Sequence, residues 1–397
     1  MQEQGKHTNR IAGFAVLLIA VALVSSGVTA FFCGLWGGGA WAPLAQMADT
    51  IARVYYYYDE KVGGEDALID AALRGMVASI GDDYAQYYTA EQYAEHMRSN
   101  SGEYSGIGIV IGAPDAEGCV IQRVYEGSPM ETAGALSGDR ILTVNGTAVA
   151  GLSLDEVLLL FQTDGTPDEL SLSRDGETFT VTVEQAVINV PYATWELLDG
   201  GIGYLRITGF NGHVVQETTD AIQALTEQGA AALIVDLRDN PGGGLTEVLG
   251  VADLFLEKGD LIVSIKSRTE QTVVYRAEDD TACTLPTVLL VNGNSASASE
   301  LLAGALQDHG VATVIGTQTF GKGIVQTYFK LAANDGWVKL TTDAYYTPND
   351  VCIHGVGIAP DFVVELPEAY RDVALDSLPR EQDTQLQAAL EHLTKGN

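Results

Sequence analysis

The chain has 397 residues, of which 46% are hydrophobic and 19% charged, and its formal net charge at pH 7 is −32. This length predicts two or more domains, and the share of apolar residues excludes a largely disordered chain. The negative charge repels phosphate groups, which argues against nucleic acid as a partner.

The first apolar segment has the length of a membrane span. It runs from Ile11 to Phe32 without a charged residue and follows Lys6 and Arg10. Residues 1–41 are therefore expected to form a cytoplasmic stub and a transmembrane anchor, with the rest of the chain extracytoplasmic. Small residues at positions 28–30 leave a second interpretation open, a signal peptide whose cleavage near Ala30 would release a secreted form. We favour the uncleaved anchor.

Residues 42–101 carry apolar side chains at helical spacing, with breaks at Gly63-Gly64 and Gly81. This pattern predicts two or three amphipathic helices. The tyrosines at positions 55–58 would point around the whole circumference of a helix. They therefore favour packing, or contact with a second copy of the chain, over a ligand site.

Residues 102–186 change to short runs with β-strand character, interrupted by a helix at Leu154–Phe161. The expected strands are Ile107–Ile111, Val120–Val124, Arg140–Val144, Glu169–Leu172 and Thr178–Val183. The segments Gly127-Ser128-Pro129, Ala133-Gly134-Ala135 and Ile141–Gly146 together resemble the middle of a PDZ domain.

Between residues 187 and 366, expected strands alternate with expected helices. The strands are Gly203–Ile207, Ala232–Val235 and Thr287–Val291, and the helices are Val214–Thr226, Leu245–Phe255 and Ser297–Gln307. This alternation predicts an α/β layer around a buried, largely parallel sheet, with the active site at the ends of its strands. In the tail, residues 367–397, an amphipathic helix at Gln382–Leu393 is expected to close the core or a dimer.

The four cysteines, Cys33, Cys119, Cys283 and Cys352, have no CxxC or Cys/His spacing. This argues against a zinc site and against a disulfide-dense scaffold. A single bridge between Cys283 and Cys352 stays open.

A serine-rich turn follows the expected strand at 287–291. The segment Ser295-Ala296-Ser297-Ala298-Ser299-Glu300 opens a helix of small residues, where a hydroxyl lies close to backbone N–H groups that have no helical acceptor. Such donors can stabilise an oxyanion. Simple capping of the helix by one of the serines is the alternative.

Histidine is the first candidate base for a serine nucleophile. Three of the six histidines lie outside the expected catalytic part, and His309 would end the helix that Ser297 begins, about 18 Å away at 1.5 Å per residue. His213 and His354 are not excluded by distance, but neither has an evident carboxylate to orient it.

Lys322 is the better candidate for the base. A lysine accepts a proton only when neutral, and lowering its pKa from about 10.4 to about 7 costs roughly 4–5 kcal/mol. Burial among Phe320, Ile324 and Val325 is expected to supply this energy, while glycines on both sides allow close approach to another backbone. Gln326, at i+4, shares the face of the lysine in a helix or a strand. A surface lysine between two glycines is the alternative.

Three separated motifs resemble those of the carboxyl-terminal processing proteases, also called tail-specific proteases. They are Leu233–Gly244, Ser295–Glu300 and Phe320–Gln326, and they are supported by Gly355–Asp361 near the end. The order of the parts also agrees, with a helical region and a PDZ-like module before the core. The resemblance covers roughly residues 45–395.

The resemblance implies a serine endopeptidase with Ser297 as nucleophile, Lys322 as general base and Gln326 as support for the lysine. It implies no metal and no cofactor. The oxyanion donors that it implies are the backbone N–H group of Ala298 and that of Gly242 or Gly243.

The PDZ-like part is implied to bind substrate C-termini. A groove beside Gly106-Ile107-Gly108-Ile109 would add the tail as an extra strand and hold its carboxylate on backbone N–H groups, which favours apolar C-terminal residues. Many relatives have Arg-Gly where this chain has Gln162-Thr163. That difference puts in doubt a coupling through such an arginine between PDZ docking and activation.

Two main functions are weighed at this point, and the intact pair of Ser297 and Lys322 counts against a third, a core that binds small apolar ligands. The first is an extracytoplasmic endopeptidase acting on proteins or peptides with accessible C-terminal tails. The alternative is a catalytically idle PDZ adaptor tethered to the membrane, which an altered Ser297, Lys322 or Gln326 would have favoured. A homodimer through the terminal helices is plausible in either case.

Overall fold

The structure, a computed structural model, describes residues 41–57, 65–100, 103–162, 165–268, 271–332, 334–371 and 373–395. The chain divides into two compact units, residues 1–87 and 88–397. The hydrophobic run expected to cross a membrane, Ile11–Phe32, lies outside the described residues. Among the helices that are described, none is both long and apolar enough for a membrane span.

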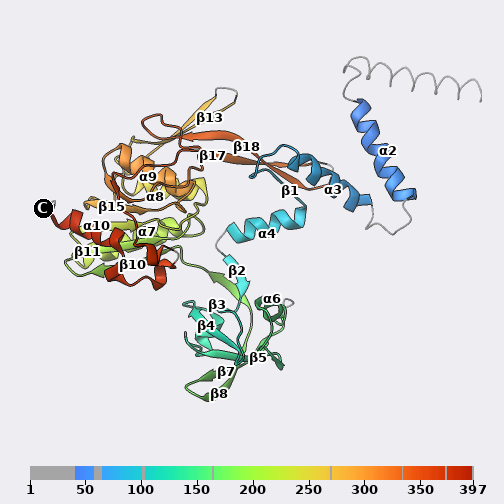
Figure 1. The fold of residues 1–397 in the computed structure, drawn as a ribbon, viewed down its shortest axis with the longest axis horizontal. Coiled ribbons are helices and arrows are strands. Elements are labelled where there is room, and N and C mark those ends of the chain that lie inside the picture. The colour runs from blue at the N-terminus through green and yellow to red at the C-terminus, as the bar shows by residue number, and fades with distance from the viewer. Residues whose placement is uncertain are drawn as a thin grey trace, which may run out of the picture. The chain divides into compact units, whose positions relative to one another are not determined.

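The region expected to be helical contains three helices. They are α2 (Trp41–Tyr57), α3 (Glu65–Ala78) and α4 (Ala90–Asn100), and a short strand, β1 (Gln86–Tyr88), precedes α4 (Figure 1). The expected break at Gly81 falls between α3 and α4, because glycine weakens a helix interior, and Gly63-Gly64 lie outside the described residues. The strand β1 was not predicted.

The PDZ-like part has an antiparallel sheet with strand order β3-β4-β5-β7-β8. These strands are β3 (Ile109–Ile111), β4 (Cys119–Val124), β5 (Arg140–Val144), β7 (Asp168–Arg174) and β8 (Glu177–Val183). Alternate apolar residues such as Ile121, Ile141 and Leu170 are fully buried between the sheet and its helices. The five expected strands are present, although the first begins at Ile109 and not at Ile107, and β3 lies at a sheet edge.

Two helices complete this part. The helix α6 (Leu154–Leu158) begins at a capping box of Ser153 and Glu156 and ends before Phe161, so the predicted helix was too long. The helix α5 (Pro129–Thr132), capped by Ser128, was not predicted as a helix. At the entry and exit of the part, β2 (Glu103–Gly106) pairs antiparallel with β9 (Ala186–Asn189).

The core contains a six-stranded sheet with the order β10-β11-β12-β15-β16-β19. Its strands are β10 (Ala193–Leu198), β11 (Ile202–Ile207), β12 (Ala232–Asp236), β15 (Thr287–Val291), β16 (Ala312–Gly316) and β19 (Phe362–Val363). All neighbours are parallel except β10 and β11. Every residue of β12 and β15 is buried, as their continuous apolar runs predicted.

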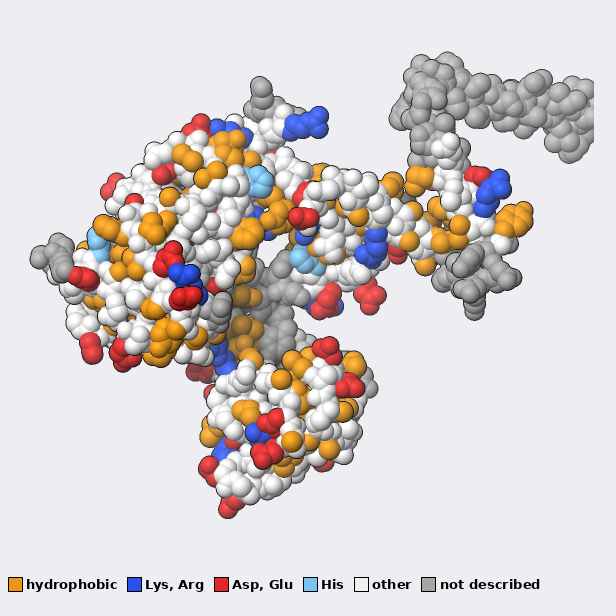
Figure 2. Space-filling view, viewed as in Figure 1, with side chains coloured by type: hydrophobic (Ala, Val, Ile, Leu, Met, Phe, Trp, Pro, Cys, Tyr) orange, Lys and Arg blue, Asp and Glu red, His pale blue; other side chains and the backbone are white. Residues whose placement is uncertain are grey.

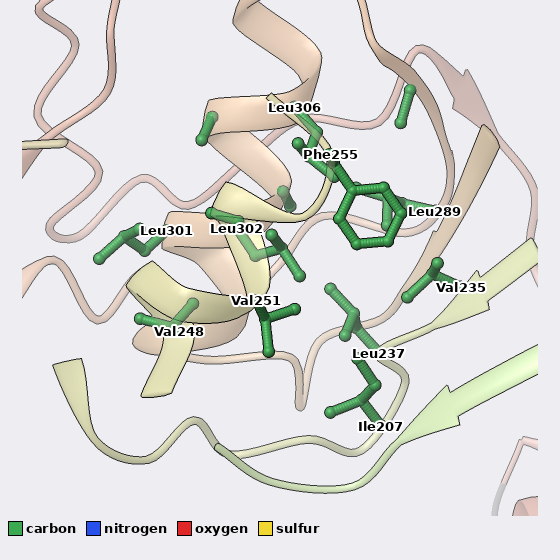
Figure 3. Close-up of a cluster of buried hydrophobic side chains, with 14 of the residues drawn as sticks. Ile207, Val235, Leu237, Val248, Val251, Phe255, Leu289, Leu301, Leu302 and Leu306 are labelled. Atoms are coloured by element: carbon green, nitrogen blue, oxygen red, sulfur yellow. The ribbon is translucent and has the colours of Figure 1, made fainter. Parts of the chain in front are cut away.

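Helices cover both faces of this sheet. The helices α7 (Val214–Glu227), α8 (Leu245–Asp253) and α9 (Ala298–Asp308) pack on one face, and α10 (Thr384–Lys395) packs on the other (Figure 1). Figure 3 shows Leu302 and Leu306 of α9 beside Val251, Phe255 and Leu289 in the first of these layers. This packing therefore fixes the sheet and α9, and with them the turn that joins β15 to α9.

A second sheet of the core is antiparallel and was missed by the sequence analysis. It includes β13 (Leu261–Ser267), β14 (Thr272–Arg276), β17 (Ile324–Lys330) and β18 (Trp337–Tyr346). The expectation of a largely parallel sheet therefore describes only the six-stranded sheet, and the core as a whole is a mixed α/β fold. Most residues of β17 and β18 are half-buried on both faces, so they lack the clear alternation that marks a strand.

The C-terminal tail is attached to the sheet by a buried ion network. The Arg238 side chain, 2% exposed, donates to both carboxylate oxygens of Asp236 and of Asp383. Asp383 also accepts the N–H of Leu386 at the start of α10, and Arg238 is the second residue of the loop after β12. The helix that was expected to close the core does so.

Acidic side chains are spread over the visible face in Figure 2 rather than gathered in one patch. The acidic side chains on this face are therefore in contact with solvent. The cysteines Cys119, Cys283 and Cys352 are all free, so the bridge left open between Cys283 and Cys352 is absent from the structure.

Candidate active site

Three loops meet at one edge of the six-stranded sheet because they follow three neighbouring parallel strands. The loop 237–244 follows β12, the turn 292–297 follows β15, and the segment 317–323 follows β16. Carboxyl ends of parallel strands lie at the same edge of a sheet. This topology brings Gly242, Ser297 and Lys322, which are far apart in the sequence, into one region.

Ser297 occupies a strained turn between β15 and α9. Its backbone has φ 55° and ψ −112°, in the left-handed region that non-glycine residues rarely adopt. Such a conformation costs on the order of 1–3 kcal/mol and persists only where the surroundings fix it. A sharp turn of this kind between a buried strand and a helix is also the geometry that exposes the nucleophile of α/β hydrolases.

The three serines of the turn have different surroundings. Ser295 is fully buried and its hydroxyl donates to the Leu237 carbonyl, while Ser299 is fully buried and donates to the Asn240 carbonyl. Both hydroxyls therefore fasten the turn to the loop after β12. Ser297 is partly exposed, and its hydroxyl makes no such bond to that loop. The N-cap residue of α9 is Ser297 itself, so capping and accessibility fall on the same, middle serine.

The loop 237–244 is fixed by Asn240, which is fully buried. Its side chain donates to the Ile207 carbonyl and accepts the N–H of Gly242 at 2.9 Å, and its own carbonyl accepts the N–H of Ala296 at 3.0 Å. A Cβ on Gly242 would lie 2.9 Å from Cβ of Ser297. Only glycine allows the loop to approach the turn this closely.

The structure distinguishes the two glycines that were considered as oxyanion donors. The N–H of Gly242 already donates to Asn240, whereas that of Gly243 has no acceptor among the described residues. The N–H of Ala298, at the first position of α9, likewise has none. The available pair of donors is therefore Ala298 and Gly243, although Gly242 is the glycine that packs against Ser297.

Glu300 connects the serine turn to the lysine segment. It is fully buried, and its Oε2 accepts the N–H groups of Ser297 and Lys322, each at 2.8 Å. Its Oε1 accepts the N–H of Gly321 and the hydroxyl of Thr319, each at 2.6 Å. Four donors thus satisfy one buried carboxylate, which holds the two segments together.

Lys322 is half-buried, and burial is the main cause that lowers the pKa of its ammonium below the ordinary value of 10.5. The positive charge of Lys339 lowers it further, and the negative charge of Glu300 opposes both. Of the three apolar neighbours expected to bury the lysine, Ile324 is buried, but Phe320 is 58% exposed, so that part of the expectation was wrong.

The glycines that flank Lys322 serve close backbone packing, as expected. A Cβ on Gly323 would lie 2.4 Å from the His354 nitrogen, and one on Gly321 would lie 3.1 Å from the Val356 nitrogen. The neighbouring backbone is the loop 353–357, which overlaps the motif at 355–361. This motif therefore supports the lysine segment from behind.

Gln326 lies on β17, directly opposite Thr341 of β18. Its Nε2 is buried and has no hydrogen-bond partner in the described part of the chain, and the same holds for Oγ1 of Thr341. A register shift between Val325 and Gln326 interrupts the alternation of faces. The argument that i+4 spacing places Gln326 on the face of Lys322 therefore fails for this strand.

The sequence left His213 and His354 open as candidate bases and excluded His309 by distance. His213 precedes the first turn of α7 and makes no side-chain capping bond. His309 ends α9, where its Nε2 lies 2.8 Å from the Leu261 carbonyl. The backbone of His354 packs against Gly323 next to Lys322.

The predicted PDZ groove lies at the edge strand β3. Ile107 and Gly108 are buried, and their carbonyls accept the N–H groups of Met130 and Tyr125. A Cβ on Gly108 would lie 2.1 Å from that of Ser128, so this position requires glycine. Gly106 ends β2, and Ile109 begins β3 half-buried. Gln162 donates its N–H to Asp168, and Thr163 lies outside the described residues.

The sequence analysis assigned no role to Glu300 or to Asn240. Glu300 had a signal, because Ser-x-x-Glu at 297–300 is the pattern of a capping box, and the Ser297 N–H indeed donates to Glu300. The second function of its carboxylate, at Lys322, depends on a segment 22 residues later and has no local signal.

Comparisons with known proteins agree with this arrangement. Residues 201–364 match the model of peptidase family S41, and residues 95–173 match that of the PDZ domain. The carboxy-terminal processing protease CtpA of Bacillus subtilis is 34% identical over 376 residues, which cover 92% of this chain and 79% of that protein. The carboxy-terminal-processing protease of Bartonella bacilliformis is 37% identical over 345 residues, covering 84% and 78%.

A solved structure of an S41-family protein from Bacteroides fragilis has the same fold. The two superpose with a TM-score of 0.55 at 17% identity, over 88% of this chain and 97% of the other. The extent and identity of the sequence relatives show the family directly. This chain belongs to the carboxy-terminal processing proteases, the PDZ-containing serine peptidases of family S41.

Proposed function

We propose that the peptidase acts outside the cytoplasm, captures substrate C-termini in its PDZ groove and cleaves peptide bonds with a Ser297–Lys322 dyad through an acyl-enzyme. The observation that carries the dyad is the shared Glu300 oxygen, which fixes the backbones of both residues beside each other. The lowered pKa of Lys322 supports its role as a base, because a larger fraction of its amine is then neutral and able to accept a proton at a given pH.

Acylation uses the groups on the three loops. Neutral Lys322 accepts the hydroxyl proton of Ser297 while the serine oxygen attacks the scissile carbonyl carbon. The oxyanion is stabilised by the free N–H groups of Ala298 and Gly243. When the C–N bond breaks, the Lys322 ammonium returns the proton to the leaving amine, and an ester to Ser297 remains.

Deacylation repeats these steps with water. Lys322 takes a proton from the water molecule as it attacks the ester, the same N–H groups hold the second oxyanion, and the proton returns to the Ser297 oxygen as the carboxylate product leaves. The open Nε2 of Gln326 supplies one hydrogen bond that a small movement of β17 would place near the lysine or the substrate. Gln326 is therefore proposed as an accessory group.

Substrate capture uses the edge of β3, where Gly106 to Ile109 receive the C-terminal residues of the substrate. Exposed apolar side chains on and after α6, namely Leu154, Leu158 and Leu159, favour an apolar tail. Because Gln162 replaces the arginine found in many relatives, capture is proposed to work without that charge.

The location is proposed from the N-terminal sequence. The charge-free run Ile11–Phe32, preceded by Lys6 and Arg10, favours a single-pass anchor with the catalytic part outside. A homodimer is proposed through the N-terminal helices and not through α10, whose apolar face already packs on the sheet. Light scattering with size-exclusion chromatography tests it.

The test of the function uses the full chain in detergent and an unfolded protein that carries an apolar C-terminal tail. Wild type and Ser297→Ala are compared, with Ser299→Ala as a control for loss of a serine from the same turn. Fragments formed by wild type but not by Ser297→Ala support the proposal. Equal cleavage by wild type and Ser297→Ala would refute Ser297 as nucleophile.

The tail is tested with the same substrate ending in acidic residues. A drop in kcat/KM of at least tenfold is expected, because the groove accepts apolar side chains. Equal cleavage of both substrates would refute capture through the PDZ groove.

A further inference from the structure

Gln326 and Thr341 face each other across the hairpin formed by β17 and β18. They are direct partners in its antiparallel register. Opposite residues of such a pair lie on one face of the sheet, with their Cβ atoms about 4.5–5.5 Å apart. The glutamine amide can therefore reach the threonine hydroxyl by rotation about side-chain bonds, with no movement of the strands.

Each of these two side chains has an unsatisfied polar atom inside the protein. Nε2 of Gln326 and Oγ1 of Thr341 are shielded from solvent, and neither has a hydrogen-bond partner among the described residues. Burying a polar atom without a partner is costly. The two atoms are also complementary, since an amide nitrogen donates and a hydroxyl oxygen accepts. One hydrogen bond between them would satisfy both.

The neighbouring threonines of the same strands form such a bond. The hydroxyls of Thr327 and Thr342 lie 2.7 Å apart and are hydrogen-bonded to each other. Thr327 follows Gln326 on β17, and Thr342 follows Thr341 on β18, so a bonded pair lies beside an unbonded one. A strand that needed only a β-branched side chain at position 341 could have valine there, which has no hydroxyl to leave unsatisfied.

The unbonded pair lies on strands that continue from the lysine segment. β17 begins two residues after Lys322, and the carbonyl of Gly323 accepts the N–H of Tyr345 of β18 at 2.9 Å. A register shift separates this contact from Gln326, and bulges of this kind re-aim side chains, often next to active sites. The backbone beside Lys322 is thus held by β18, and the amide of Gln326 is left to be oriented.

We propose that Thr341 is a positioning residue for Gln326, because its hydroxyl accepts one hydrogen of Nε2 during catalysis and thereby fixes the amide. Nε2 carries two hydrogens, so the second is still available to the lysine or the substrate. The inference rests on the proposed function, in which Gln326 is the accessory group of the dyad.

Thr341→Val separates this role from a structural one. Valine keeps the β-branched shape and removes a hydroxyl that has no bond to lose, so the melting temperature is expected to stay at or above the wild-type value. For the tailed substrate, kcat is expected to fall about three- to tenfold with KM little changed, because an amide that is free to turn is often misplaced. Thr341→Ser keeps the hydroxyl and should have the wild-type kcat. An unchanged kcat in Thr341→Val would overturn the inference.

Thr342→Val is the matched control. It removes the neighbouring hydroxyl, which is bonded to Thr327. It is expected to lower the melting temperature and to leave kcat unchanged. A loss of kcat equal to that of Thr341→Val would reveal a general effect of changes in the hairpin and would also overturn the inference.

A double-mutant cycle asks whether Thr341 acts through Gln326. Gln326→Leu removes the amide, and adding Thr341→Val to it should cause no further loss of kcat, because residues that act as one unit are not additive. Losses that multiply in the double variant would mean that Thr341 acts independently of the glutamine. Full activity of Gln326→Leu would contradict the accessory role of Gln326 and the inference with it.

The hydrogen bond itself is measured without turnover, in Ser297→Ala. The full chain is deuterated, isotope-labelled at its glutamine amides and studied by NMR in detergent, and the Gln326 signal is identified by its absence from Gln326→Leu. A substrate peptide is expected to shift this signal in Ser297→Ala, and not when Thr341→Val is added. The same response in both proteins would overturn the inference. A failure of the proposed function is recognised separately, as cleavage that persists in Ser297→Ala.

Discussion

The backbone N–H groups of Ser297 and Lys322 donate to one and the same oxygen, Oε2 of Glu300, each at 2.8 Å. The two nitrogens therefore lie within twice that distance of each other, although they belong to loops that follow different strands. A buried carboxylate with four donors is costly to disturb. We infer that the relative position of the serine turn and the lysine segment depends on Glu300.

Replacing this carboxylate tests that inference. In Glu300→Gln the amide keeps one acceptor oxygen but directs an NH2 group at buried N–H donors. We expect kcat/KM to fall about 100-fold or more, because the contact that positions the two segments is weakened. The free energy of unfolding is expected to fall by about 2–4 kcal/mol. Kinetics and urea unfolding measure the two effects.

Glu217→Gln is the matched control. Glu217 is half-buried on α7 and accepts the N–H groups of Tyr192 and Ala193 at the start of the edge strand β10, two strands away from β12. It is expected to lose stability with kcat/KM unchanged. If Glu300→Gln behaved in the same way, Glu300 would be a structural residue and not one that positions the dyad.

The pH dependence of cleavage follows from the lowered pKa of Lys322. The neutral amine is the active form, so kcat/KM should rise with pH and level off above the folded pKa, which lies below the ordinary 10.5. Lys322→Arg should abolish turnover with an unchanged melting temperature, because arginine stays protonated. Substantial cleavage by Lys322→Arg would remove the lysine from the mechanism.

Close contact between Gly242 and the serine turn gives a third prediction. A Cβ at Gly242 would lie 2.8 Å from the Ala296 carbonyl oxygen and 2.9 Å from Cβ of Ser297, so Gly242→Ala must displace the turn. We expect kcat to fall about 100-fold or more with KM little changed, since a misplacement near 1 Å has this effect.

Gly229→Ala serves as the comparison. Gly229 also has a positive φ, +85° against +106° at Gly242, but an added Cβ there meets no atom within 4 Å. Both variants are strained by alanine in a left-handed conformation, and only Gly242→Ala should lose activity. Equal kinetics for the two would show that the contact with Ser297 has no bearing on catalysis.

The sequence predicted much of this site because its signals are local. Buried runs at 232–235 and 287–291 located the two central strands, and the small-residue helix after them located the serine turn. Parallel neighbours then required the loops to meet at one edge. The choice among Ser295, Ser297 and Ser299 came from the family resemblance, and the structure supplies the reason, since the two outer hydroxyls are engaged with the loop after β12.

Other features depend on contacts that no local pattern records. The hairpin of β17 and β18 was missed because half-buried residues on both faces give no alternation. Phe320 was expected to bury the lysine, but a neighbouring apolar residue in the sequence can point to solvent at a turn. The choice of Gly243 over Gly242 as oxyanion donor depends on whether Asn240 already occupies the N–H, which only coordinates reveal.

The ion network at Arg238 gives a last prediction, about stability. Arg238→Met leaves Asp236 and Asp383 buried without their cation, and breaking a buried pair in this way costs about 3–5 kcal/mol. The exposed pair of Arg371 and Glu365 is the control, and Arg371→Met should cost less than about 1 kcal/mol. Urea unfolding of both variants measures the difference. Because Arg238 lies in the loop that holds Gly243, and Asp383 directly precedes α10, the loss should also loosen the C-terminal tail, which limited proteolysis detects as earlier cleavage after residue 366. Similar free energies for the two variants would mean that the sheet and α10 hold together through their apolar contacts alone.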